Sequence, residues 1–155
     1  EQGAIKAIYF VMSEDDLELA MQHPRVMLSS DGRAVAPYGE LGRGAVHPRY
    51  YGTFPRILGR YVRERRLMTL EEAINKITYL PAKKIKLKKR GLLKEGYFAD
   101  ITIFNKDEVI DVATFEKPHQ YPKGIEYVIV NGDIVINKGE HTGVFPGKVL
   151  NRKFD

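Results

Sequence analysis

The sequence predicts an α/β segment followed by a small antiparallel β unit. Three observations support this: two short apolar runs flank a helical stretch near the amino terminus, amphipathic helical patterns occupy residues 53–80, and strand-like runs follow residue 91. At 155 residues, with 43% hydrophobic and 29% charged residues, the chain is long and apolar enough to form a globular core. We therefore expect residues 1–90 to form one unit and residues 91–155 a second, smaller one.

The first 28 residues have the pattern of a strand, a helix and a second strand. Residues 5–12 are mostly apolar and partly β-branched or aromatic, as expected for a strand covered on both faces. Ser13 can cap a helix that must end before Pro24, because proline disfavours helical geometry in the residue before it. Residues 26–28 form the next apolar run. A unit of this kind predicts two parallel strands joined by a right-handed crossover.

Asp31 is the candidate catalytic residue because it directly follows the second predicted strand. A carboxylate at the carboxyl end of a parallel strand lies where α/β enzymes build their active sites. The sequence Ser30-Asp31-Gly32 is also typical of a turn, in which the aspartate caps its own backbone and glycine takes the left-handed conformation. The residues alone leave both interpretations open.

Residues 29–53 lack regular periodicity and are rich in glycine, which predicts a long loop. Long loops in compact domains are often binding loops or lids, although a solvated loop can have the same composition. Its side chains could anchor a polar or anionic ligand. The candidate substrate-binding residues are His47, Arg49, Tyr50 and Tyr51.

Two helices are predicted after the loop. Thr53 can cap the first helix, with Pro55 in its first turn. The second helix is predicted to begin with a capping box at Thr69 and Glu72 and to stop at Leu80, before a proline. Their apolar residues recur at helical spacing, so we expect these helices to supply core contacts.

The period changes to that of β-strands in the last third of the chain. Residues 97–104 and 126–136 are strand-like, and Asn131-Gly132 lies inside the second run. Asn-Gly between β-branched residues is the strongest short signal for a β-hairpin. The sequence therefore predicts a small antiparallel β unit here.

Composition excludes several classes of site. The chain has no cysteine, so a metal would have to be held by histidine, carboxylate or water. The four histidines show no His-x-His or His-Glu-x-x-His spacing, which favours structural or solvated roles for each of them.

No run approaches the roughly 18 apolar residues of a membrane span, and no signal-peptide pattern is present. The high lysine, glutamate and arginine content favours a cytoplasmic protein from a hot environment.

Residues 83–90 hold six basic and no acidic side chains, in a chain whose net charge is +5. Such a basic run could bind nucleic-acid phosphates. It lacks the interleaved aromatic side chains of a nucleic-acid platform, however, and charge runs are usually solvated faces. We therefore do not expect nucleic-acid binding.

Six stretches of the chain carry a family resemblance. They are 26–32, 47–56, 70–74 with 80–82, 91–100, 113–119 and 130–132. Together they resemble, in order, the carboxyl-terminal part of the N-acyl-D-amino-acid deacylases, or D-aminoacylases. These enzymes are a branch of the amidohydrolase superfamily of metal-dependent (β/α)8-barrel hydrolases. The stretch His-Pro-Arg-Tyr-Tyr-Gly-Thr-Phe-Pro-Arg is characteristic of this branch, whereas Gly-x-x-x-x-Gly-x-x-Ala-Asp followed by Val-Asn-Gly is shared more widely.

The resemblance implies a fold and a site. Residues 5–28 would supply the last two barrel strands with the helix between them, and the carboxyl-terminal part would form a small β-sandwich-type domain. Asp31 would approach a zinc ion and act as the proton shuttle in hydrolysis of the amide bond of N-acyl-D-amino acids. His47, Arg49, Tyr50 and Tyr51 would line or gate the mouth of the site. Asp100 would be structural.

The family's remaining metal ligands have no counterpart in this sequence. We therefore expect a piece of a larger enzyme, inactive alone, that assembles with the missing amino-terminal barrel portion or with copies of itself. Two strands cannot close a barrel, so their apolar face would be exposed without such a partner. The alternative is a non-catalytic oligomerisation or interaction module derived from the same fold.

Overall fold

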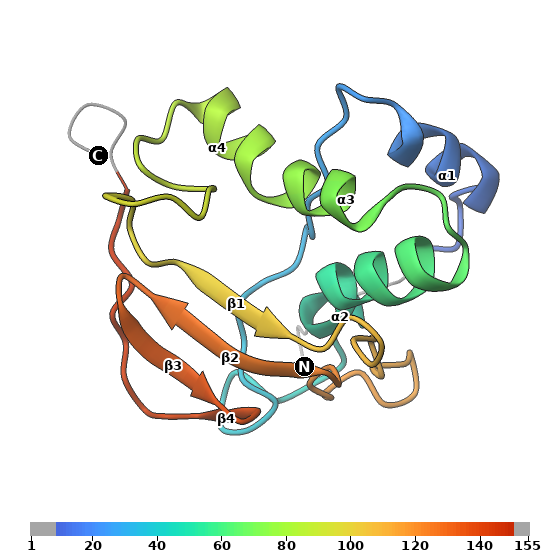
Figure 1. Ribbon diagram of the computed structural model, residues 1–155. Helices are drawn as coiled ribbons and strands as arrows, with labels where there is room; N and C mark the ends of the chain where they lie inside the picture. The colour runs from blue at the N-terminus through green and yellow to red at the C-terminus, as the bar shows by residue number, and fades with distance from the viewer. Residues whose placement is uncertain (1–8, 151–155) are drawn as a thin grey trace.

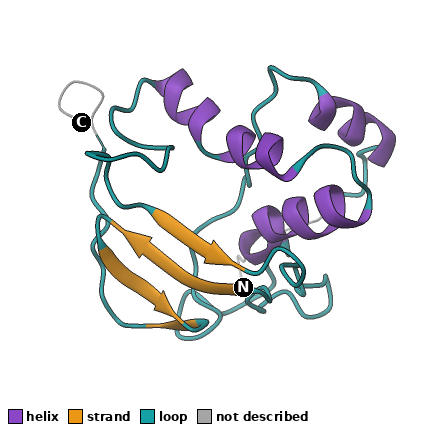
Figure 2. Ribbon diagram, viewed as in Figure 1, coloured by secondary structure: helices purple, strands orange, loops and turns teal. Residues whose placement is uncertain are grey.

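A computed structural model describes residues 9–150 of the chain. The helices gather in one half of the molecule and a single antiparallel sheet forms the other (Figures 1 and 2). None of the described helices is long and apolar enough to cross a bilayer. In chain order the elements are the α-helix α1 (Glu14–Gln22), the α-helix α2 (Arg49–Arg56), the π-helix η1 (Ile57–Glu64), the α-helices α3 (Leu70–Ile77) and α4 (Tyr79–Ile85), and the strands β1 (Ile101–Phe104), β2 (Ile125–Val130), β3 (Asp133–Asn137) and β4 (Glu140–His141).

Helix α1 begins and ends as its sequence predicts. The Ser13 hydroxyl accepts a hydrogen bond from the Asp16 amide at 3.3 Å, and three acidic residues occupy the first turn. Carboxylates there interact favourably with the positive end of the helix dipole. The helix ends at Gln22, before Pro24.

The two strands predicted on either side of α1 are not formed in the described residues. Residues 5–8 lie outside the described part, and residues 9–12 and 26–28 have no strand pairing. A parallel strand obtains its hydrogen bonds from neighbouring strands. No such neighbour is present within residues 9–150, so the apolar pattern alone does not form a ladder. Within residues 9–150, the helix of the predicted unit is formed and its two strands are not.

The first helix after the loop begins earlier than predicted, at Arg49. The hydroxyl of Thr53, the predicted cap, instead donates to the Arg49 carbonyl at 3.0 Å from inside α2. Pro55 lies near the end of α2 rather than in its first turn, and it cannot donate a helical hydrogen bond. The chain continues from Ile57 in a π-helical conformation. The loop is therefore shorter than predicted.

The capping box of α3 is confirmed. The Thr69 hydroxyl accepts from the Glu72 amide at 3.2 Å, and the Glu72 carboxylate accepts from the Thr69 amide at 2.8 Å. The helix does not continue to Leu80 as predicted; it ends at Ile77, and α4 holds Pro81 in its first turn. Proline is tolerated there because first-turn amides have no partner within the helix.

The four strands pair in the order β1-β2-β3-β4, each antiparallel to the next. The predicted hairpin is confirmed: Asn131 and Gly132 join β2 to β3, both with positive φ (51° and 94°). Two positive φ values are the signature of the type I′ turn that Asn-Gly favours. β1 is shorter than predicted. The described residues form one sheet, without the second sheet that a sandwich requires.

Asp100 connects two motifs of the sequence, the Gly-x-x-x-x-Gly-x-x-Ala-Asp stretch at 91–100 and the Val-Asn-Gly stretch at 130–132, through one hydrogen-bond network. Its carboxylate accepts from the backbone amide of Asn131 at 2.8 Å and pairs with the guanidinium of Arg90. Arg90 also donates to the Asn131 side-chain carbonyl at 2.8 Å and stacks 4.2 Å over the ring of Phe98. The Asn131 amide group in turn donates to the Pro146 carbonyl. These contacts support a structural role for Asp100.

The core lies where α1, η1 and α3 meet. Gly59 allows η1 to approach the later loop closely, because a Cβ atom there would collide with the Val109 carbonyl and the Ile110 side chain. The core therefore draws on residues from both sides of residue 90. Its buried members are Met21, Ile57, Leu58, Tyr61, Ala73 and Val109.

Candidate functional site

Asp31 and Arg49 form an ion pair at the point where the loop meets α2. The Arg49 Nη2 lies 2.9 Å from Asp31 Oδ2, and the Asp31 side chain is 83% exposed. Asp31 adopts a left-handed backbone conformation with a φ of 45°. Non-glycine residues occupy this region rarely, and such residues are found at functional sites when the surroundings hold them there.

The turn around Asp31 differs from the predicted one. The Ser30 hydroxyl, not the Asp31 carboxylate, accepts the amide of Gly32 at 3.1 Å, and Asp31 rather than Gly32 is left-handed. A Cβ atom at Gly32 would lie 3.0 Å from the Arg49 carbonyl oxygen and 3.1 Å from Tyr50 Cα. The absence of a side chain therefore lets the turn pack directly against the start of α2, and the Asp31 carboxylate is left free to face Arg49.

His47 lies beside this ion pair. Its Nδ1 accepts a hydrogen bond from the Arg49 backbone amide at 3.0 Å, and its ring meets Phe115 edge-on with 5.1 Å between the ring centroids. Burial lowers the pKa of His47 below its ordinary value, and the charge of Arg49 lowers it further, whereas the charge of Asp31 raises it. His47 is therefore neutral near pH 7, with its proton on Nε2.

The two charges beside His47 should move its pKa in opposite directions. We expect Arg49→Met to raise the pKa of His47 toward 6.5 and Asp31→Asn to lower it further. The pKa of His47 is lower in the folded chain than in the unfolded chain, where it is 6.5. The contribution of His47 to folding stability is therefore complete above pH 6.5 and is lost as the pH falls through its folded pKa. NMR titration of the His47 ring in the two variants measures both shifts. A shift of the same sign in both variants would contradict this placement.

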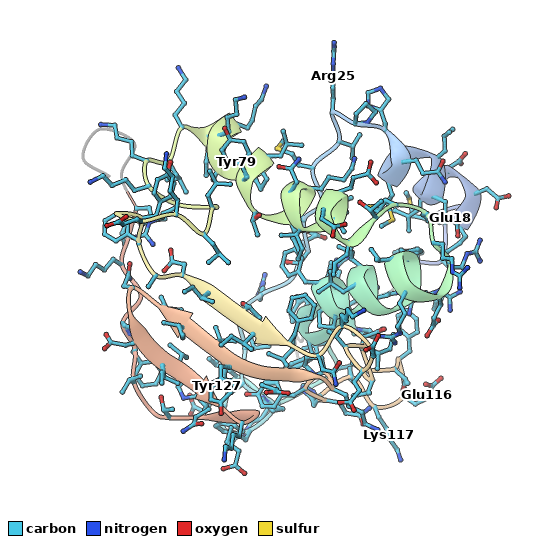
Figure 3. The ribbon with its side chains drawn as sticks, in the orientation of Figure 1. Glu18, Arg25, Tyr79, Glu116, Lys117 and Tyr127 are labelled. Carbon is cyan, nitrogen blue, oxygen red and sulfur yellow. The ribbon has the colours of Figure 1, made fainter. Side chains whose placement is uncertain are left out.

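A largely apolar cavity of about 670 Å³ opens next to His47 and Arg49. Its walls come from α1, the 26–29 segment, α2 and the 113–116 loop. Charged side chains lie on its walls, with Arg56 Nη1 3.2 Å from Asp111 Oδ2 and the Tyr61 hydroxyl donating to Glu14 at 3.0 Å. Asp31, Tyr50 and Tyr51 are not among the residues that line it. Figure 3 shows Glu116, in the 113–116 loop, beside Lys117 at the lower right of the molecule.

Tyr51 is buried and contacts a different part of the chain. Its hydroxyl lies 3.1 Å from His119 Nδ1, and His119 Nε2 lies 2.8 Å from the Gly44 carbonyl oxygen. The ring of Tyr51 also packs edge-on against Tyr121. Because the Gly44 carbonyl can only accept, His119 donates from Nε2 and accepts the Tyr51 hydroxyl at Nδ1. These contacts join the 38–48 loop to the 118–121 segment.

The described residues contain no group of three or more histidine, cysteine, aspartate or glutamate side chains that could hold a metal ion. The histidines serve local structure instead. His23, His47 and His141 each accept a nearby backbone amide at Nδ1, and His119 bridges Tyr51 and Gly44.

Sequence reasoning missed three side chains that the structure makes prominent. Arg56 and Asp111 form the ion pair on the cavity wall. Lys76 is almost completely buried, at 5% exposure. A signal for Lys76 was available, because it lies three residues after the fully buried Ala73 and so shares its helical face.

A family model described as the amidohydrolase family matches residues 5–136. The chain belongs to the amidohydrolase family. This match covers most of the chain and agrees with the resemblance carried by its motifs.

Three curated relatives place this amidohydrolase near the deacylases of N-acylated D-amino acids. The chain is 44% identical over 145 residues to N-acyl-D-aspartate deacylase of Alcaligenes xylosoxydans xylosoxydans, covering 93% of this chain and 28% of that protein. It is 43% identical to D-aminoacylase of the same organism, covering 94% and 29%. N-acyl-D-glutamate deacylase of that organism is 42% identical, covering 94% and 28%. The chain therefore spans less than a third of the length of these relatives.

Solved structures give the same placement. A D-aminoacylase structure, described for its binuclear metal centre, superposes with a TM-score of 0.84 at 41% identity, covering 93% of this amidohydrolase and 29% of that chain. N-acyl-D-glutamate deacylase from Bordetella bronchiseptica, in complex with zinc and a phosphonate mimic of the tetrahedral intermediate, superposes with a TM-score of 0.74 at 42% identity. The superposition covers 86% of this chain and 27% of the solved deacylase chain. The predicted relationship to the D-aminoacylases is confirmed.

Proposed function

We propose that this chain is the carboxyl-terminal part of a metal-dependent amidohydrolase that hydrolyses the amide bond of N-acyl-D-amino acids. The similarity over 93–94% of the chain to three deacylases of this class carries the proposal. The site supports it, because a carboxylate, a guanidinium and a neutral imidazole lie together beside an apolar cavity. Carboxylate and apolar acyl groups are the two chemical features of such a substrate.

The described residues do not by themselves fit a metal ion, since no three or more histidine, cysteine, aspartate or glutamate side chains gather around Asp31 or elsewhere among them. We therefore propose zinc only for the complete enzyme, with most of its ligands supplied from outside residues 9–150. Asp31 is the side chain of this chain that we propose to approach it. When bound, the metal would supply Lewis-acid activation of water and carbonyl.

Asp31 is proposed as the catalytic acid and base. Its carboxylate would accept a proton from the water that attacks the amide carbonyl and then deliver that proton to the leaving nitrogen. Its exposure and its position on a turn held against α2 support this role, because the carboxylate can reach a substrate without rearrangement of a packed side chain.

Arg49 is proposed to bind the free carboxylate of the N-acyl amino acid. A guanidinium can hold a carboxylate through two parallel hydrogen bonds. The exposed pair with Asp31 is weak enough for a substrate to displace, because exposed ion pairs contribute at most about 1 kcal/mol. His47 would lie at the cavity mouth beside it, and Tyr50 and Tyr51 would support the loop that closes the site.

The division of the chain at residue 90 stays a prediction. Every described helix lies before it and every described strand after it, which supports assigning residues 1–90 to the end of the (β/α)8 barrel and residues 91–155 to a small β domain. In the complete enzyme we propose that residues 5–12 and 26–28 pair with the preceding barrel strands. The sandwich-type arrangement would likewise need strands from elsewhere.

The test is a chimera in which this chain replaces the matching part of the D-aminoacylase of A. xylosoxydans. We expect the chimera to release D-amino acids from N-acetyl-D-amino acids and to leave the N-acetyl-L enantiomers intact. Chiral chromatography of the products measures this. The unaltered D-aminoacylase is the positive control, and circular dichroism shows that the chimera is folded. A folded chimera that cleaves neither enantiomer would contradict the proposed function.

A further inference from the structure

Lys76 is a buried lysine without a carboxylate partner. Lys76 is only 5% exposed, and no acidic side chain within residues 9–150 forms an ion pair with its ammonium group. Burying an ammonium group is unfavourable unless hydrogen bonds compensate for the lost hydration. A methionine or leucine would fill the same volume without that cost, so packing alone does not account for a lysine here.

The partners of Lys76 all belong to the segment that leads to Asp31. Its Nζ donates to the Val26 carbonyl at 3.1 Å and to the His23 carbonyl, and its own backbone carbonyl accepts the Leu28 amide at 3.2 Å. One residue of α3 therefore binds the segment on both sides of Met27. Hydrogen bonds from a charged donor are among the stronger ones in proteins.

The segment has a second attachment beyond Asp31. Gly32 packs against the backbone of Arg49 and Tyr50 at the start of α2. Asp31 thus lies between two fixed points, with Leu28 held to α3 on one side and Gly32 held to α2 on the other. Helix α3 is itself fixed by its capping box and by the complete burial of Ala73.

We propose that Lys76 is the positioning residue for Asp31. Its ammonium holds the backbone of residues 23–28 at a constant distance from α3, and that constraint sets where the Asp31 carboxylate is presented. The proposal rests on the proposed catalytic role of Asp31 for its effect on turnover, whereas its effect on the segment is independent of any activity.

The first experiment measures amide hydrogen exchange by NMR in this chain. Lys76→Met keeps the volume of the side chain and removes the donor, and Lys84→Met, at an exposed lysine of α4, is the matched control. Loss of charged hydrogen bonds should speed exchange of the Leu28 amide at least about tenfold. Amides of β2 and β3 should be unchanged, and Lys84→Met should have no effect.

A rescue experiment uses the absence of cysteine from the chain. In Lys76→Cys the new thiol is the only one, so 2-bromoethylamine applied to the denatured chain places an ammonium group at this position alone. After refolding, slow exchange at Leu28 should return. The unalkylated Lys76→Cys chain should stay fast, which separates the charge from the effect of side-chain volume.

The second experiment places Lys76→Met in the chimera. We expect kcat to fall at least about tenfold with KM within twofold, since a misplaced acid and base affects the chemical step more than binding. Faster exchange throughout β2 and β3, unchanged exchange at Leu28, or an unchanged kcat would each overturn the proposal. If the chimera with Lys76 is itself inactive while Leu28 responds as expected, the proposed function fails and the attachment by Lys76 stands.

Discussion

Asp31→Asn should lower kcat of the chimera by about 10²–10⁴-fold, because the amide cannot accept a proton and return it to the leaving nitrogen. The substitution preserves the size of the side chain. It also leaves the fold intact, since an exposed ion pair with Arg49 contributes at most about 1 kcal/mol to stability. Steady-state kinetics with an N-acetyl-D-amino acid measure the loss, and elemental analysis of the purified protein measures its metal content.

Asp107→Asn is the matched control for this substitution. Asp107 is exposed to a similar degree, with a side-chain exposure of 76%, and lies in a turn after β1 remote in sequence from the site. We expect that variant to keep the kcat of the parent chimera. If Asp31→Asn retained near-normal turnover with normal metal content, the acid and base role of Asp31 would be wrong. A loss of metal together with activity would assign Asp31 to metal binding instead of proton transfer.

The features predicted correctly from the sequence depend on neighbouring residues. The Ser13 cap, the capping box of Thr69 and the Asn131-Gly132 hairpin each close within a few positions. Their hydrogen bonds are decided by local side-chain chemistry and backbone preference. Such features form in the same way whatever the rest of the protein contains.

Strands are different, because their hydrogen bonds come from partners distant in sequence. Residues 26–28 have the composition of a buried strand, yet in the described structure the Val26 carbonyl and the Leu28 amide form hydrogen bonds with Lys76 of α3 instead of with a neighbouring strand. Two proline positions also differ from the prediction. Pro55 lies near the end of α2 instead of in a first turn, and Pro81 lies in the first turn of α4 instead of just after a helix.

The candidate site was only partly accessible to sequence reasoning. The sequence indicates Asp31 and Arg49 separately, but their contact depends on how the loop folds back against α2. The pairing of Tyr51 with His119 spans 68 positions and leaves no local pattern. Lys76 shares the helical face of Ala73, but a charged residue on that face interrupts the apolar pattern, and the pattern does not show that its ammonium donates to backbone carbonyls.

The exposed apolar side chains before α1 make the final prediction. Residues 9–12 are 78–81% exposed although all four are large and apolar. Covering four such side chains would contribute on the order of 6–12 kcal/mol. We propose that the amino-terminal barrel portion covers them. Alone, the chain should be inactive and should self-associate in light scattering. Co-expressed with the remaining part of the D-aminoacylase of A. xylosoxydans, it should purify as a complex with deacylase activity.

Val11→Lys tests which surface forms that complex. Val11 is exposed in the isolated chain, so lysine should not disturb its fold, but in the complex a charge would be buried in place of an apolar group. Deacylase activity recovered by co-expression should therefore fall at least about tenfold. Val149→Lys, at a residue 97% exposed in the carboxyl-terminal segment, should have no effect. Equal recovery with both variants would show that residues 9–12 are not the contact surface. A tight complex without turnover would make the chain an interaction module, because assembly would then have been restored without the chemistry that Asp31 is proposed to perform.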